Sequence, residues 1–204
     1  MRLLVPAKAL DRAKTRLALP PDVRLLVARA LVERTLATAS ETVGPDRVTV
    51  VTDGADVRRL AAPLGVDVLD ENAGGLNSAL DLGIGHLRRL DPPATCVVLV
   101  SDLPLISVAD LGEVLTHLDA ASTPRHVADL HGSGTTLLAL PAGATLPLGF
   151  GPGSARHFAE AGSRLLDPVP ASLRTDLDTL ADLANLPASA RDAILSGGPG
   201  DRMG

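Results

Sequence analysis

The sequence has almost no aromatic residues: its 204 positions include two phenylalanines and no tryptophan or tyrosine. Proteins that bind single-stranded nucleic acids stack the bases on aromatic rings, so the composition argues against that class. The formal net charge of -5 offers no basic surface for duplex DNA or RNA either. We therefore expect no nucleic-acid partner.

Cysteine and long apolar stretches are also scarce. Cys96 is the only cysteine, which excludes an intrachain disulfide and suits a reducing compartment. No run approaches the ~20 apolar residues that a membrane helix needs. The start MRLLVPAKAL lacks the pattern of a signal peptide. We expect a cytoplasmic protein with no membrane partner.

Lysine is the scarce basic residue, since only Lys8 and Lys14 among the 19 lysines and arginines are lysine. Both lie in the segment VPAKALDRAKTRL, together with Arg12 and Arg16. The segment has neither the G-x-x-x-x-G-K of a P-loop nor the glycines of a dinucleotide fingerprint. A cluster of cations suits phosphate groups, although a solvated basic loop has the same composition.

Apolar runs alternate with helical patterns along the first 120 residues. Strands are predicted at 2–6, 48–52, 66–70 and 95–102, and helices at 21–42, 57–64, 75–90 and 107–118. This alternation predicts an α/β fold of three layers, with a mostly parallel central sheet flanked by helices. The run HVADLHGSGTTLLALP predicts a small antiparallel insertion. We expect one domain over residues 1–195 and a flexible C-terminal tail over 196–204.

Ligands of open α/β sheets bind beyond the carboxyl ends of the strands. That rule points to the loops 7–16, 53–54, 70–77 and 102–106. Asp102 ends the most apolar of the predicted strands. It is either an ordinary turn residue or a metal ligand at the sheet edge.

The stretch RTDLDTLADL, residues 174–183, carries carboxylates in close sequence. Thr179 and Asp182 match a helix-capping pattern. Asp176 and Asp178 share one face if the segment is extended, because side chains two apart point the same way. A hard cation such as Mg²⁺ relieves their repulsion, whereas a solvated surface pair needs no cation.

Two glycine-bearing stretches, HGSGTT and GFGPGSARHF, contain Thr135, Gly151 and Ser154. Exposed amides at a helix start, together with a serine hydroxyl, suit an anion. An ordinary hairpin turn and an ordinary helix cap use the same residue types.

Six stretches in this order resemble the 2-phospho-L-lactate/phosphoenolpyruvate guanylyltransferase family of coenzyme F-420 biosynthesis. They span residues 6–183 and read PAKALDRAKTRL, GLNSAL, SDLPLI, DLHGSGT, FGPGSARH and LRTDLDTLADL. The resemblance implies a nucleotide-diphospho-sugar transferase-like fold. It implies transfer of GMP from GTP to a small phosphorylated acid with release of pyrophosphate. With phosphoenolpyruvate as the acceptor, the product is enolpyruvyl-diphospho-guanosine.

The resemblance also implies roles for particular residues. Asp102, Asp176 and Asp178 would hold Mg²⁺ and, with Lys8, would form the catalytic set. The nucleotide would meet Lys8, Asn77 and Asp102. The acid substrate would meet Thr135, Gly151, Ser154, Lys14 and Arg16.

The acceptor and the exact activity stay open at this point. Phosphoenolpyruvate is the first choice, because an Ala-, Arg- and Leu-rich chain suggests a GC-rich source, with 2-phospho-L-lactate and 3-phosphoglycerate as alternatives. A nucleotidyltransferase for molybdenum cofactor or sugar phosphate, and a non-catalytic nucleotide-binding module, are the rival functions. Leu180 and Thr136 depart from the family pattern, which often has proline and asparagine at these positions.

Overall fold

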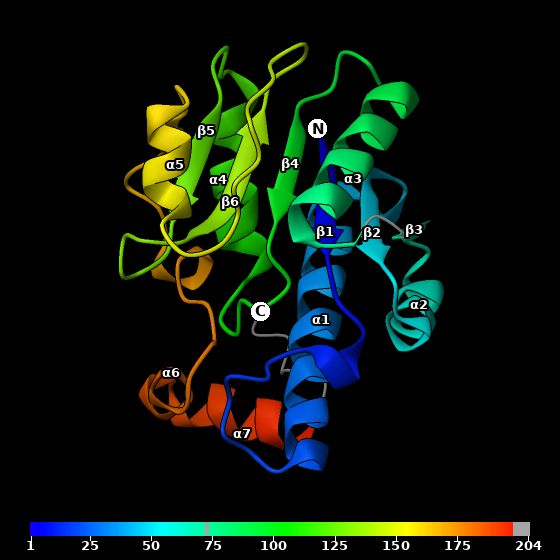
Figure 1. Ribbon diagram of the computed structural model, residues 1–204, viewed down its shortest axis with the longest axis vertical. Coiled ribbons are helices and arrows are strands. Elements are labelled where there is room, and N and C mark those ends of the chain that lie inside the picture. The colour runs from blue at the N-terminus through cyan, green and yellow to red at the C-terminus, as the bar shows by residue number, and fades with distance from the viewer. Residues whose placement is uncertain (72–73, 198–204) are drawn as a thin grey trace.

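The computed structural model describes residues 1–71 and 74–197. One seven-stranded sheet runs through the molecule in the order β3-β2-β1-β4-β6-β5-β7 (Figure 1). Its strands are β1 (Arg2–Pro6), β2 (Val48–Thr52), β3 (Asp67–Asp70), β4 (Cys96–Leu99), β5 (Arg125–Ala128), β6 (Thr135–Leu140) and β7 (Arg164–Leu165). The predicted three-layer α/β architecture is confirmed.

The sheet has a parallel part and an antiparallel part. Strands β3, β2, β1 and β4 pair in parallel, and β6 runs antiparallel to both β4 and β5. The predicted antiparallel pair is therefore present, and it continues the central sheet instead of standing apart from it. Strand β7, which the sequence pattern did not reveal, pairs in parallel with β5.

Helices cover both faces of the sheet, because its central strands bury side chains in two directions. One apolar cluster joins the sheet to α1 (Pro21–Val43), α2 (Ala55–Ala61) and α4 (Val108–Asp119). The other joins its opposite face to α3 (Leu76–Leu90) and α5 (Ser154–Glu160). Four short 3-10 helices complete this part, η1 (Leu10–Arg12), η2 (Pro45–Arg47), η3 (Ala62–Leu64) and η4 (Ala171–Leu173).

A third apolar cluster links the C-terminal segment to the first half of α1. It contains Leu177 and side chains of α6 (Leu180–Asn185) and α7 (Ala188–Ser196), and Figure 1 shows α7 beside α1. Packing of α7 on α1 places the C-terminal helices in the same body as the sheet. Residues 198–204 of the predicted tail lie outside the described residues.

Two local predictions are wrong in detail. The fourth strand is shorter than 95–102, because the chain after Val100 leaves the sheet and the Asp102 carbonyl oxygen accepts from the Leu177 amide (3.1 Å). Only one of the two hydrogen bonds of the capping box expected at Ser107 and Asp110 forms. Ser107 accepts from the Asp110 amide, whereas the Asp110 carboxylate accepts from Ser172 (2.6 Å).

The helices over the described residues include none that is both long enough and apolar enough to span a membrane.

Candidate functional site

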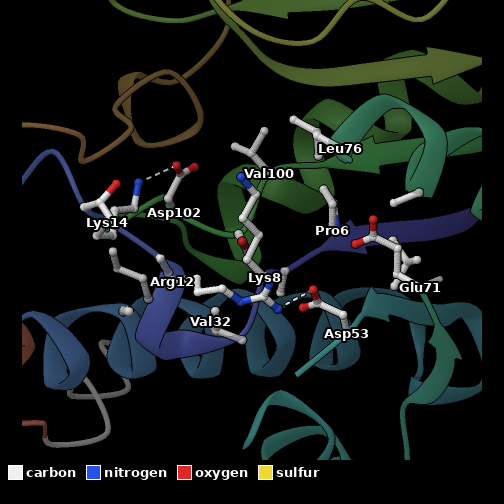
Figure 2. A pocket seen from close by; sticks show the side chains of 18 of the residues that line it. Pro6, Lys8, Arg12, Lys14, Val32, Asp53, Glu71, Leu76, Val100 and Asp102 are labelled. Atoms are coloured by element: carbon white, nitrogen blue, oxygen red, sulfur yellow. Dashed lines mark hydrogen bonds and ion pairs between the residues drawn. The ribbon is translucent and has the colours of Figure 1, made fainter. Parts of the chain in front are cut away.

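The strand ends to which the sequence pointed meet at one edge of the sheet. Parallel register brings the carboxyl ends of β1 to β4 together, and β6 begins beside the end of β4. A cavity of ≈ 840 Å³ lies at this edge. Charged side chains of both signs line it, namely Lys8, Arg12, Lys14, Arg16, Asp53, Glu71, Asp102 and Asp178. Figure 2 labels all of these except Arg16 and Asp178.

The basic loop 7–16 is held by acidic residues that follow β2. The Ala9 amide donates to Asp53 Oδ1 (3.1 Å) and the Leu10 amide to Asp56 Oδ2 (2.9 Å). Arg12 forms an ion pair with Asp53 (Figure 2). Burial raises the pKa of Asp53, but the hydrogen bonds from Arg12 and Ala9 prevail and lower it below its ordinary value. The loop is thus attached by both its backbone and its charge.

Gly54 allows the close approach of this loop to the start of α2. A Cβ atom at Gly54 would lie 2.7 Å from the Cα of Ala9 and 2.5 Å from Oδ1 of Asp56. Real Cβ atoms do not approach backbone so closely, so only glycine fits there without displacing the loop.

Lys14 lies between two carboxylates at the other end of the loop. Its Nζ is 2.6 Å from Asp102 Oδ2 and 2.9 Å from Asp178 Oδ1. The Lys14 side chain is only 10% exposed. Burial lowers the pKa of Lys14, yet the charges of Asp102 and Asp178 outweigh it and the net pKa is raised. The ammonium therefore stays charged and joins the end of β4 to the C-terminal segment.

The backbone of Lys14 is itself unusual. Within the described residues it is the one non-glycine position with positive φ, at 54°. Such a conformation costs on the order of 1 kcal/mol and persists where surrounding contacts impose it. Here the two ion pairs of the side chain are the contacts that hold it.

Asp176 and Asp178 flank a buried anchor. Leu177 is fully buried in the cluster with α1, and its amide donates to the Asp102 carbonyl oxygen. The two aspartates therefore project away from that cluster, as the spacing of two predicts. Asp182 accepts from the amides of Asp178 (3.0 Å) and Thr179 (2.7 Å) in a full capping box, which fixes the segment.

The pKa of Asp176 shows that the acidic residues share one electrostatic environment. Burial, followed by the charges of Asp102 and Asp178, raises the pKa of Asp176 to about 6. Asp102 and Asp178 are thus brought together around the Lys14 ammonium, and their charges contribute to the raised pKa of Asp176, which is not among the residues that line the cavity.

These residues suit a divalent cation in their chemistry, although they do not form a ready metal cage. The described residues contain no group of three His, Cys, Asp or Glu side chains arranged to hold a metal. Asp102 Oδ1, however, is buried and has no hydrogen-bond partner there. An unpartnered buried carboxylate oxygen costs roughly 1–3 kcal/mol, and carboxylate oxygens are the ligands that Mg²⁺ prefers. The chemistry of these carboxylates therefore fits Mg²⁺, and its binding by Asp102, Asp176 and Asp178 stays a prediction.

Lys8 and Arg16 contribute further charge to the cavity. Both are exposed residues that line it, and Lys8 extends between the Arg12 and Lys14 ion pairs in Figure 2. Their positions suit contact with an anionic ligand.

Thr135, Gly151 and Ser154 come together at the antiparallel part of the sheet edge. Ser154 Oγ donates to Thr135 Oγ1 (3.0 Å), and both side chains are buried. Gly151 has φ of 135°, and its carbonyl oxygen accepts from the Ser154 amide (3.1 Å). None of the three lines the ≈ 840 Å³ cavity. Their substrate-binding role stays a prediction.

Asn77 joins α3 to the glycine-bearing loop. Its amide nitrogen donates to the Phe150 carbonyl oxygen (3.2 Å), and its Oδ1 accepts from the Phe150 amide (2.8 Å). Both hydrogen-bonding groups of the side chain are engaged by backbone, and Asn77 does not line the cavity. Its nucleotide-binding role is a prediction that this geometry leaves open.

Two carboxylates of the cavity, Asp53 and Glu71, were not singled out from the sequence. They follow the second and third strands directly. The rule that ligands bind beyond the strand ends had selected these loops, so the same rule could have found the residues.

Comparisons with known proteins agree with this arrangement. Residues 1–186 match the model of the family described as "Guanylyl transferase CofC like". The chain is 42% identical to a phosphoenolpyruvate guanylyltransferase of Streptomyces coelicolor, over 89% of this chain and 87% of the relative. It is 36% identical to one of Sanguibacter keddieii, over 98% of this chain and 81% of the relative.

Solved structures share the fold at low sequence identity. A nucleotidyl transferase of Methanothermobacter thermautotrophicus matches with a TM-score of 0.59 and 19% identity, over 96% of this chain and 98% of that one. A 4-diphosphocytidyl-2C-methyl-D-erythritol synthase matches with a TM-score of 0.61 and 12% identity, over 90% and 96%. Fold and sequence relatives therefore agree, and the chain belongs to the guanylyl transferase CofC-like family.

Proposed function

We propose that this chain transfers GMP from GTP to phosphoenolpyruvate, releasing pyrophosphate and forming enolpyruvyl-diphospho-guanosine for coenzyme F-420 biosynthesis. The observation that carries the proposal is the charged cavity of a CofC-like chain, in which a four-cation loop faces Asp102 and Asp178. The names of the relatives favour phosphoenolpyruvate as acceptor over 2-phospho-L-lactate.

The reaction joins two polyanions, so neutralising and positioning charge is its main requirement. A phosphate oxygen of the acceptor attacks the α-phosphorus of GTP. The bond from that phosphorus to the bridging oxygen of the β-phosphate breaks, and pyrophosphate leaves with its electrons. The acceptor phosphate is already ionised at neutral pH, so no general base is needed. Lys8 and Arg16 supply the positive charge that faces the phosphates.

Asp102, Asp176 and Asp178 would hold Mg²⁺. When bound, the ion offsets the negative charge that develops on the transferring phosphoryl group. The unpartnered oxygen of Asp102 and the shared environment of the three carboxylates support this assignment.

The acid substrate would bind near Thr135, Gly151 and Ser154, at the start of β6 and of α5. Support for this position comes from β6 beginning beside the end of β4, where the Val100 amide donates to the Thr136 carbonyl oxygen (3.0 Å). Asn77 would fix the loop that carries Gly151. The cytoplasmic location expected from the sequence stays a prediction.

A pyrophosphate-release assay tests the proposal. Purified protein is given Mg²⁺, GTP or CTP, and one acceptor from phosphoenolpyruvate, 2-phospho-L-lactate, 3-phosphoglycerate or a sugar phosphate. We expect release only with GTP, fastest with phosphoenolpyruvate. Preference for CTP or a sugar phosphate would indicate a different nucleotidyltransferase. GTP binding without release for any acceptor would indicate a non-catalytic nucleotide-binding module.

A further inference from the structure

The position of Lys14 has a consequence for how the metal enters. Its ammonium contacts Asp102 Oδ2 at 2.6 Å and Asp178 Oδ1 at 2.9 Å, so its single positive charge is shared between two of the three carboxylates. The side chain is almost fully buried, and its backbone is held at φ 54°. This lysine is therefore built into the acidic cluster as a fixed internal cation.

An ammonium and a divalent ion compete for the same two carboxylates, Asp102 and Asp178. Both need Asp102 and Asp178 within direct reach, and the two positive charges repel at such a distance. A divalent ion carries twice the charge of the ammonium, and it also needs water or phosphate oxygens to complete its coordination shell. Lys14 therefore has to withdraw from at least one carboxylate before the ion occupies the cluster.

We propose that Lys14 is the resident counter-ion of the metal site, which holds Asp102 and Asp178 together in the free protein and gives way to the divalent ion when nucleotide binds. The inference rests on the metal site of the proposed function. The triphosphate offers the displaced ammonium a new anionic partner, since Lys14 lines the same cavity as Lys8 and Arg16. Lys14 thus couples metal binding to nucleotide binding.

The test measures Mn²⁺ binding to the full chain without nucleotide, through the electron paramagnetic resonance signal of free Mn²⁺. Lys14→Met removes the ammonium and keeps the length of the side chain. We expect it to lower the Kd for Mn²⁺ at least about tenfold relative to the wild type. Lys8→Met removes an equal charge from the same cavity without touching Asp102 or Asp178, and should change the Kd by less than about threefold.

A second measurement separates a counter-ion from a merely structural lysine. In EDTA, Lys14→Met should melt at a lower temperature than the wild type, and Mn²⁺ should restore it, because the ion replaces the lost charge. If Lys14→Met does not fold, Lys14→Asn serves, since asparagine tolerates positive φ.

Unchanged or weaker Mn²⁺ binding in both Lys14 variants would overturn the proposal and make Lys14 a supporting partner of the metal ligands. This result is distinct from failure of the proposed function, which would appear as no pyrophosphate release by the wild type. A wild type that turns over while binding Mn²⁺ as tightly without GTP as with it would also contradict the coupling.

Discussion

Two cations of one loop, Arg12 and Lys14, each reach a carboxylate at a strand end, yet their surroundings differ. The Arg12 side chain is 58% exposed, and the loop beside it is also held by the amides of Ala9 and Leu10. The Lys14 side chain is 10% exposed and contacts two carboxylates from distant parts of the chain. Exposed pairs contribute about 0–1 kcal/mol, whereas breaking a buried pair is costly. We therefore expect the Arg12 end to attach the loop and the Lys14 end to belong to the proposed metal site.

The largest expected effect is a difference in kcat between substitutions of Asp178, which pairs with Lys14, and of Asp53, which pairs with Arg12. Asp178→Asn should lower kcat about a hundredfold or more, because it removes a proposed metal ligand. Asp53→Asn should lower kcat by no more than about tenfold relative to the wild type, because the ion pair between Asp53 and Arg12 is exposed. Steady-state pyrophosphate release by both variants checks this, with circular dichroism as the control for folding. Equal losses would erase the distinction between the two ends.

The next largest effect is the loss of stability expected when a side chain is added at Gly54, where the loop 7–16 approaches α2. Gly54→Val should destabilise the protein by about 2 kcal/mol, because the added side chain meets the backbone of Ala9. Urea unfolding measures the difference, and Gly85→Val serves as the comparison, since the nearest atom to a Cβ there is an arginine nitrogen at 3.5 Å. A Gly54 variant no less stable than the Gly85 variant would show that the loop does not depend on this close approach.

A smaller effect depends on pH and concerns Asp176. Its pKa is raised to about 6 from 3.8, so the folded state holds this proton more tightly than the unfolded state. The contribution to stability is present below pH 3.8 and is lost as pH rises through about 6. Asp176→Asn should therefore raise the free energy of unfolding by about 1 kcal/mol relative to the wild type at pH 8, after allowance for solvent screening.

Urea unfolding in EDTA at pH 5 and pH 8 measures this gain. The difference between Asp176→Asn and the wild type should be smaller at pH 5. A difference that is constant with pH would show that Asp176 does not titrate in this range.

The smallest effect concerns Arg12 itself. Arg12→Met should leave the urea midpoint of unfolding almost unchanged, because its ion pair is exposed and the backbone amides of Ala9 and Leu10 still hold the loop. Urea unfolding beside the Gly54 variant sharpens the contrast. A loss for Arg12→Met as large as for Gly54→Val would mean that charge, and not backbone contact, attaches the loop.

The sequence predicted the fold well where apolar periodicity is strong. Strand β1 begins and ends as expected, because RLLVP is buried on both faces, whereas the strand at Cys96 is shorter because Asp102 pairs by its backbone with Leu177. Such a contact between distant segments leaves no local signal. Strand β7 is only two exposed residues, too short for any periodicity.

The sequence pointed to several residues that the structure brings together at the sheet edge, but not to the contacts between them. Strand-end reasoning pointed to Asp102, and the spacing of two pointed to Asp176 and Asp178. The family resemblance implied that Lys14 meets the acid substrate. A lysine in a basic loop gives no local indication that it will be buried between two carboxylates. That pairing depends on positive φ at Lys14 and on the tertiary path of residues 176–178, neither of which follows from local pattern.

The most direct test of the central claim is phosphorus NMR of a reaction containing the protein, Mg²⁺, GTP and phosphoenolpyruvate. We predict the two coupled resonances of a new diphosphate ester together with free pyrophosphate, and neither signal with Asp178→Asn. A wild-type reaction that yields no diphosphate ester, or a Asp178→Asn variant that yields it at the wild-type rate, would contradict the account.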